Sequence, residues 1–109
     1  MTYAAVQPFN FLAGTEVLGT GTEGWNLDQF PAPGGPDRSA RVAVTFAREF
    51  AAFPLIHLSI TGLDVCNEDA ARVTVTAENV TTKGFEIVVA TWLDTRIWRT
   101  QVSWLAIGS

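Results

Sequence analysis

The residues best suited to chemistry in this 109-residue chain are gathered in the segment TWLDTRIW, positions 91 to 98. Trp92 and Trp98 stand six positions apart and bracket Asp94 and Arg96. An indole provides a flat apolar face for stacking, and the charged side chains provide fixed hydrogen-bond acceptors and donors. This combination is typical of sugar recognition. The same residues are compatible with two core tryptophans on either side of a solvated turn.

Two further charged residues extend this set. Asp37 follows the loop PAPGGP at positions 31 to 36, and Arg72 stands at the start of an alternating apolar segment. A carboxylate and a guanidinium could together bond the hydroxyls of a neutral ligand. From the residue types alone, a surface ion pair or a turn-capping aspartate is the simpler interpretation.

Motifs for catalysis or metal binding are not found in the sequence. His57 is the sole histidine, lies in the apolar run LIHLS and has no nucleophile partner in a known motif. Cys66 is the sole cysteine, which excludes an intrachain disulfide and favours a free buried thiol over an intermolecular link. Glu68 and Asp69 form an acidic pair that is typical of a solvated turn. We therefore expect a protein that is not an enzyme and uses no metal or cofactor.

Charge and hydropathy exclude several partners. The net charge is −4 and the pI is near 4.7, whereas nucleic acids and anionic membranes attract basic surfaces. No apolar run has the length of a membrane span, so no membrane insertion is expected. The start MTYAAVQPFNFLAG lacks the features of a signal peptide. The sequence therefore predicts a soluble protein, for which a place outside the cell or on its surface would require export without a signal peptide.

Period-two alternation recurs along the chain and predicts strands. Four segments each carry apolar residues on one face: Val42, Val44 and Phe46; Val73, Val75 and Ala77; Phe85, Ile87 and Val89; and Val102, Trp104 and Ala106. The run FPLIHLSI, positions 53 to 60, is predicted to be buried on both faces, and further strands are predicted near Val17 and Trp25. Short strands between polar breaks predict an antiparallel sandwich or barrel, with residues 1–109 forming one domain.

Some strands carry apolar residues on their second face as well, namely Val88, Ala90, Leu105 and Ile107. A small sandwich needs only one inner face for each strand. The surplus favours a surface between identical subunits. The alternative is that these residues lie under loops or cap the ends of the sandwich.

Four segments together resemble the H-type lectin domain: LSITGLDV, ARVTVTAENVTTKGF, ATWLDTRIW and VSWLAIG. The resemblance runs from about Gly24 to the C-terminus, is closest from Leu58 to Ile107, and does not clearly cover residues 1–23. It implies a six-stranded antiparallel β-sandwich that assembles as a trimer. It also implies metal-free sites at the subunit interfaces for galactose-type glycans, typically N-acetylgalactosamine.

The resemblance also implies roles for single residues. Arg72 matches an arginine that bonds the sugar, and Trp92 matches the tryptophan of a TW motif near the site. Trp98 stands where the family usually has a tyrosine that stacks on the sugar from the neighbouring subunit. Asp37 and Gly35 match a loop aspartate and a glycine that contacts the sugar through its backbone, although the loop is shorter in this chain.

The segment TWLDTRIW then poses a question of geometry. A hairpin with an even loop would pair Trp92 with Ile97 and point Trp98 to the opposite face, whereas an odd loop or a bulge would bring the two indoles opposite each other. From the resemblance we expect Trp98 to be exposed at a subunit boundary and Trp92 to be mostly packed.

The chain also departs from the family. Leu93 stands in place of a histidine that contacts the sugar, which leaves the exact sugar open. Val89 and Ala51 stand at cysteine positions of the snail agglutinins, so disulfide-linked pairs of trimers are not expected. We expect a lectin for terminal galactose or N-acetylgalactosamine. The alternative is a structural or adhesive β-module, such as a spike or fibre tip, without a working sugar site.

Overall fold

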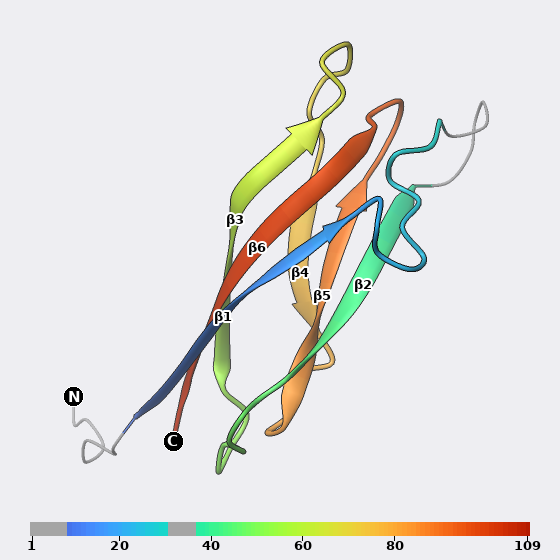
Figure 1. The fold of residues 1–109 in the computed structure, drawn as a ribbon. Coiled ribbons are helices and arrows are strands. Elements are labelled where there is room, and N and C mark those ends of the chain that lie inside the picture. The colour runs from blue at the N-terminus through green and yellow to red at the C-terminus, as the bar shows by residue number, and fades with distance from the viewer. Residues whose placement is uncertain (1–8, 31–36) are drawn as a thin grey trace, which may run out of the picture.

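The computed structural model describes residues 9–30 and 37–109 and consists of two three-stranded antiparallel sheets that form a sandwich (Figure 1). One sheet has the strand order β1-β6-β3 and the other has β2-β5-β4. The strands are β1 (Asn10–Gly19), β2 (Arg38–Thr45), β3 (Leu55–Val65), β4 (Thr74–Glu78), β5 (Gly84–Thr91) and β6 (Ile97–Gly108). The expected all-β sandwich with six antiparallel strands is confirmed. Within the described residues, no helix is long and apolar enough to cross a membrane.

The core lies between the sheets and is formed by the predicted alternation. The inward residues of β2, β5 and β6 belong to one buried cluster, which includes Val44, Phe46, Phe85, Ile87, Val89, Val102 and Ala106. Trp104 packs against this cluster, with its ring centroid 5.6 Å from that of Phe85. On β1, a Cβ at Gly14 would lie 2.7 Å from Nε1 of Trp104, so only glycine allows this strand to pass over the indole.

Two predictions about the strands are wrong. Residues 53–60 are not buried on both faces, because the described residues do not cover the outer face of the β1-β6-β3 sheet and Leu55, His57 and Ser59 are exposed there. Within the described range 20–30, no strand forms near Trp25. This residue is buried in the loop after β1, where its indole N–H donates to the carbonyl oxygen of Ile97 at 3.0 Å.

The hairpin expected for TWLDTRIW is also not formed. Strand β5 belongs to one sheet and β6 to the other, so residues 92–96 cross between the layers and Trp92 does not pair with Ile97. The segment is apolar enough at both ends to look like a hairpin, but each end packs in a different sheet.

The apolar surplus divides between the two sheets. Val88 is buried within the single chain, between Arg41 of β2 and Thr76 of β4 in the sheet register. Leu105 and Ile107 instead lie partly exposed on the outer face of β6. Among the described residues, the apolar outer face that the chain leaves uncovered is therefore that of the β1-β6-β3 sheet.

The loops that connect the strands lie at the two ends of the sandwich. Residues 20–30, 66–73 and 92–96 lie at the upper end of the sandwich in Figure 1, while the C-terminus and the β2–β3 connection lie at the lower end. Of the residues expected to bind sugar, those that the structure describes, namely Asp37, Arg72, Trp92 and Trp98, lie towards this upper end, which we call the loop end.

Candidate functional site

The sheet register brings three predicted site residues to one edge of the β2-β5-β4 sheet. Arg38 pairs with Thr91, so Asp37 and Trp92 extend the two neighbouring strands by one residue each. On the other side of β5, the hydroxyl of Thr91 donates to the carbonyl oxygen of Arg72 at 2.5 Å. Asp37, Trp92 and Arg72 thus follow one another across the loop end of this sheet.

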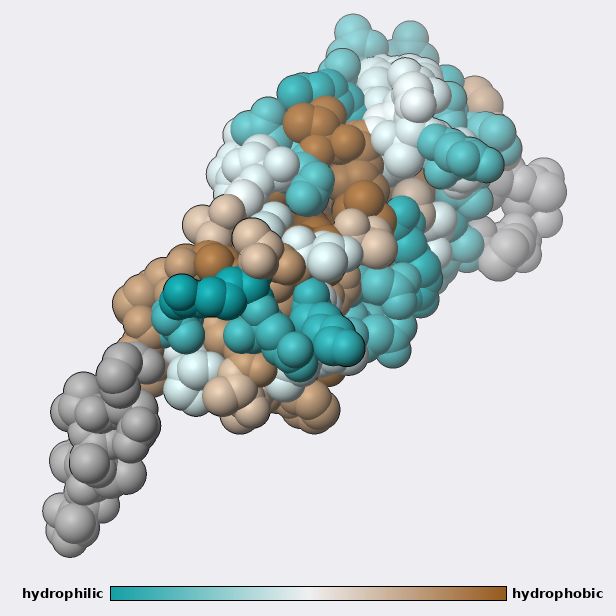
Figure 2. Space-filling view, turned by 60° about the horizontal axis from the view of Figure 1, so that its bottom comes forward, coloured by the Kyte–Doolittle hydropathy of each residue, from teal (hydrophilic) through white to brown (hydrophobic). Residues whose placement is uncertain are grey.

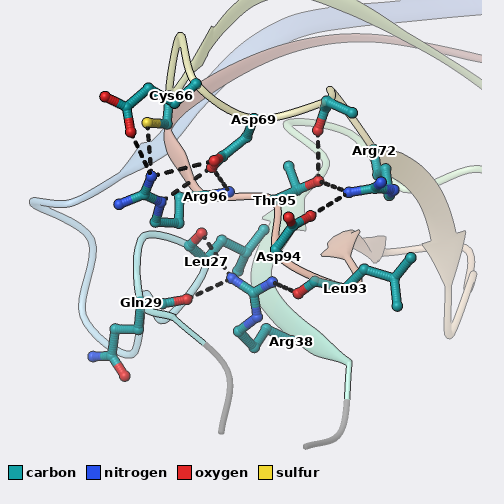
Figure 3. A network of polar contacts seen from close by, with 12 residues as sticks. Leu27, Gln29, Arg38, Cys66, Asp69, Arg72, Leu93, Asp94, Thr95 and Arg96 are labelled. Atoms are coloured by element: carbon teal, nitrogen blue, oxygen red, sulfur yellow. Dashed lines mark hydrogen bonds and ion pairs between the residues drawn. The ribbon is translucent and has the colours of Figure 1, made fainter. Parts of the chain in front are cut away.

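The side chain of Arg72 is oriented by the turn after Trp92. Its Nη1 donates to Oδ1 of Asp94 at 2.7 Å and to Oγ1 of Thr95 at 2.9 Å (Figure 3). Among the described residues, only this nitrogen of the guanidinium makes hydrogen bonds. The remaining N–H groups can therefore donate to a ligand while the arginine keeps its position.

Thr95 is a supporting residue that was not singled out from the sequence. It is fully buried, accepts the hydrogen bond from Arg72 and donates its own proton to the carbonyl oxygen of Ala70 at 2.6 Å. A threonine so close to charged residues suits a solvated turn equally well, so its type gave no signal of this role.

Arg38 is the second supporting residue that the sequence did not identify. The residue is only 7% exposed, and its guanidinium donates to three backbone carbonyls. The acceptors are the carbonyl oxygens of Leu27 at 3.2 Å, Gln29 at 2.7 Å and Leu93 at 2.8 Å (Figure 3). Arg38 therefore joins the 20–30 loop to the 92–96 crossover directly beside Asp37.

Leu93 occupies the rim of this site. It has a φ of 56°, in the left-handed region that non-glycine residues seldom adopt, and its side chain is 64% exposed. The carbonyl oxygen is held by Arg38. An apolar side chain is consequently held out beside Asp94 at the position where the family resemblance implied a histidine.

Arg96 belongs to a structural cluster and not to the Arg72 site. Its side chain donates to both carboxylate oxygens of Asp69, at 3.1 and 3.2 Å, and to the sulfur of Cys66 at 3.0 Å. Its guanidinium also lies 3.9 Å from the centre of the Phe30 ring. The hydrogen bonds from Arg96 hold the pKa of Asp69 below its ordinary value, with burial acting in the opposite direction, and Asp69 raises the pKa of Arg96.

This cluster corrects one expectation and supports another. The side chain of Asp69 is only 6% exposed, so it is not part of a solvated turn, whereas its neighbour Glu68 is exposed as expected. Cys66 is a buried free thiol, as predicted.

Trp98 lies on the other sheet, at the start of β6. Its carbonyl oxygen accepts a hydrogen bond from the amide of Thr20 at 3.0 Å. Both Trp98 and Trp92 are partly buried within the single chain. Gly35, the remaining predicted site residue, lies outside the described residues.

The sequence from residue 41 to residue 107 matches the model of the H-type lectin domain, which is more than half of the chain. The chain belongs to the H-type lectin family. This confirms the resemblance found in the sequence and identifies a carbohydrate-binding lectin domain, from a family that is non-catalytic. Arg72, Trp92 and Trp98 fall inside the matched region of this lectin domain, and Asp37 falls before it.

Two curated relatives each match about two thirds of this chain. A protein of Fuscovulum blasticum named ATP synthase subunits region ORF 7 is 41% identical over 76 residues, which cover 70% of this chain and 66% of that protein. A discoidin-1 subunit of Dictyostelium discoideum is 31% identical over 74 residues, which cover 67% of this chain and 29% of that protein. The chain thus spans just under two thirds of the first relative and less than a third of the second.

Solved structures of discoidin II from Dictyostelium discoideum share the fold. The wild-type protein superposes with a TM-score of 0.79 at 20% identity, over 97% of this chain and 39% of that one. The recombinant native protein gives a TM-score of 0.80 at 19% identity, over 99% of this chain and 40% of that one. The sandwich of this lectin domain is therefore the fold of one part of a longer discoidin chain.

Proposed function

We propose that this lectin domain binds terminal galactose or N-acetylgalactosamine, without a metal or cofactor, and that it acts as a multivalent trimer and not as an enzyme. The observation that carries the proposal is the alignment of Asp37, Trp92 and Arg72 across one sheet edge, with Arg72 held by Asp94. These residue types at these positions are the ones that the resemblance assigns to sugar binding.

Each side chain has a distinct part in this proposal. The free N–H groups of Arg72 donate to ring hydroxyls, and the carboxylate of Asp37 accepts from them. Trp92 borders the ring, and Trp98 of the adjoining protomer stacks on the apolar face of the sugar. Gly35 contributes a backbone contact.

Binding at one site is expected to be weak. The hydroxyls of a sugar are hydrogen-bonded to water before binding, so each new hydrogen bond contributes only about 0.5–1.5 kcal/mol. Sites repeated on one particle raise the apparent affinity for dense glycans, because the second and third contacts become intramolecular. A multivalent assembly is therefore part of the proposed function.

The outer face of the β1-β6-β3 sheet supports such an assembly. In its first rows, Phe11 of β1, Ile107 of β6 and Leu55 of β3 lie side by side, and the next row contains Leu105 and His57. Phe11 is 64% and Leu55 69% exposed in the single chain. Figure 2 displays hydrophobic surface around the end of the sandwich where β1 begins. Exposed apolar patches of this kind mark contact surfaces.

The polar part of the same face is compatible with burial. Oγ of Ser103 lies 3.1 Å from the hydroxyl oxygens of both Thr15 and Thr61, and Thr61 accepts from Nε2 of Gln101 at 3.2 Å. Arg99 donates to the other end of the Gln101 amide at 3.2 Å. Because the hydroxyls and the Gln101 amide bond one another, a second protomer could cover these residues at a small polar cost, provided that the exposed guanidinium of Arg99 stays open to solvent. The number of three protomers comes from the family resemblance.

The test is calorimetric titration of the purified protein with N-acetylgalactosamine, galactose, glucose and mannose. We expect binding of the first two sugars and its loss in the variant Arg72→Ala. Arg41→Ala is the matched control, because Arg41 is an exposed arginine on β2 whose ion pairs with Glu78 and Glu86 lie away from the loop end.

Normal sugar binding by Arg72→Ala would show that the site is elsewhere. An absence of binding to any galactose-type glycan by the unmodified protein would instead favour the structural or adhesive module. Leu93, which presents an apolar side chain in place of a histidine, is the feature that favours this second function.

A further inference from the structure

A concave surface lies at the loop end, between the last residues of β1 and the first residues of β6. It has a volume of about 360 Å³ and is lined by Val17, Gly19, Thr20, Gly21, Thr22, Trp98 and Arg99. This volume lies at the lower end of the range of about 300–1,000 Å³ for small-ligand sites. We call this surface the β1–β6 cleft.

The walls of the β1–β6 cleft are fixed by backbone hydrogen bonds. The amide of Thr20 donates to the carbonyl oxygen of Trp98 at 3.0 Å, and the amide of Thr22 donates to that of Gly19 at 2.8 Å. A Cβ at Gly19 would lie 2.6 Å from the carbonyl oxygen of Trp98, so glycine is required for this close approach. The cleft is therefore formed before any ligand binds.

The lining has the mixed chemistry that a neutral sugar needs. Trp98 and Val17 supply apolar residues, and Thr20, which is exposed, supplies a hydroxyl group. Oγ1 of Thr22 accepts a hydrogen bond from the amide of Gly19 at 3.0 Å, which leaves its own proton available to a ligand. Among the described residues that line the cleft there is no carboxylate, and Arg99 carries the charge.

We propose that the β1–β6 cleft is a second carbohydrate subsite, which takes the sugar residue linked to the terminal galactose or N-acetylgalactosamine of an oligosaccharide. This inference rests on the proposed function, because Trp98 is both part of the cleft lining and the residue that stacks on the terminal sugar. Under that assignment the cleft adjoins the terminal sugar at Trp98. The preferred ligand is a disaccharide or longer glycan and not a single sugar.

One or two additional hydrogen bonds and a small apolar contact in the cleft correspond to an affinity gain of about tenfold. The experiment compares N-acetylgalactosamine and galactose with disaccharides that end in these sugars, in α and β 1,3 and 1,4 linkages, by calorimetric titration of the full chain. We expect at least one disaccharide to bind about tenfold more tightly than its own terminal sugar.

The variant Gly21→Leu tests whether the second subsite lies in the β1–β6 cleft. A Cβ at Gly21 meets no atom within 4 Å, and the backbone there is not in the left-handed region, so a leucine is tolerated and adds bulk at a residue that lines the cleft. We expect the disaccharide advantage to disappear while the affinity for the single sugar is unchanged. Glu23→Leu adds the same side chain at an exposed position of the same loop outside the lining, and it should retain the advantage.

A second variant, Thr20→Val, keeps the volume of the side chain and removes the hydroxyl, so it should lose part of the advantage. The subsite proposal is wrong if every disaccharide binds only as tightly as its terminal sugar. It is also wrong if Gly21→Leu keeps the full affinity advantage of the disaccharide. Neither result would contradict the terminal-sugar site. If neither single sugars nor disaccharides bind, the terminal-sugar site is itself wrong and the subsite proposal fails with it.

Discussion

The guanidinium of Arg38 lies 2.8 Å from the carbonyl oxygen of Leu93, 55 residues away in the chain. This contact joins the first residue of β2 to the crossover that leaves β5, and two more carbonyls of the 20–30 loop share the same side chain. One buried arginine therefore determines how two loops meet beside the proposed sugar site.

Replacement of this arginine should be costly. In Arg38→Met, three carbonyl groups lose a charged donor, and we expect the free energy of unfolding to fall by about 2–4 kcal/mol. Urea denaturation followed by tryptophan fluorescence measures the change. The control Arg41→Met removes an arginine that is exposed and should change stability little. Equal effects of the two substitutions would contradict the role given to Arg38.

The proposed assembly can be tested through a residue that the single chain leaves exposed. In Leu55→Asp, a carboxylate enters the apolar row formed with Phe11 and Ile107, and its desolvation on burial should prevent association. We expect the mass in solution, measured by light scattering, to fall from that of a trimer to that of the 11.8 kDa chain.

Ala43→Asp is the control for that experiment, because it adds a carboxylate to an exposed position of β2 in the opposite sheet. It should leave the mass unchanged. A Leu55→Asp variant that keeps the mass of the unmodified protein would exclude the β1-β6-β3 face as the contact surface.

The ion pair between Asp69 and Arg96 predicts a dependence of stability on pH. The pKa of Asp69 is lowered in the folded state, chiefly by hydrogen bonds from Arg96. The pair therefore stabilises the fold above the ordinary aspartate pKa of about 4, and this contribution is lost as the pH falls through the lowered folded-state pKa. We expect Asp69→Asn to melt at a lower temperature than the unmodified protein at pH 7, with a difference that narrows below about pH 4.

Glu68→Gln provides the comparison for the pH experiment, because the Glu68 side chain is exposed and lies 3.9 Å from Arg96. Its melting temperature should follow that of the unmodified protein at every pH. A difference between Asp69→Asn and the unmodified protein that stays constant from pH 7 to pH 3 would show that packing, and not charge, accounts for the stabilisation.

The sequence predicted those parts of the fold that depend on local alternation. The core residues of β2, β5 and β6 follow a period of two because each strand has one inner face, and this pattern is visible without tertiary information. The covering of a sheet face is different. The apolar residues of β3 are as hydrophobic as those of a strand buried on both faces, and Leu55 and His57 are exposed because the described residues leave the outer face of the β1-β6-β3 sheet uncovered.

The candidate site was predictable to a similar extent. Arg72, Trp92 and Asp37 were identified by residue type and family resemblance, and the sheet register brings them to one edge. Arg38 and Thr95 were missed because their partners are backbone carbonyls and a side chain distant in sequence, which leave no pattern of spacing. The crossover of residues 92–96 was missed because a change of sheet and a hairpin have the same local sequence requirements.

Asp94 allows the orientation of Arg72 to be separated from the stability of the fold. The side chain of Asp94 is 70% exposed, and an exposed ion pair contributes about 0–1 kcal/mol, so Asp94→Asn should leave the melting temperature almost unchanged. Loss of the charged acceptor weakens the hold on the Arg72 guanidinium, although Thr95 still accepts a hydrogen bond from it, so more order must be gained when the sugar binds. We expect the dissociation constant for N-acetylgalactosamine to rise roughly three- to tenfold in a calorimetric titration.

Glu78→Gln removes the exposed partner of Arg41 in a comparable ion pair and should leave sugar binding unchanged. Sugar binding by Asp94→Asn that equals that of the Glu78→Gln control would show that Asp94 does not prepare Arg72 for the ligand.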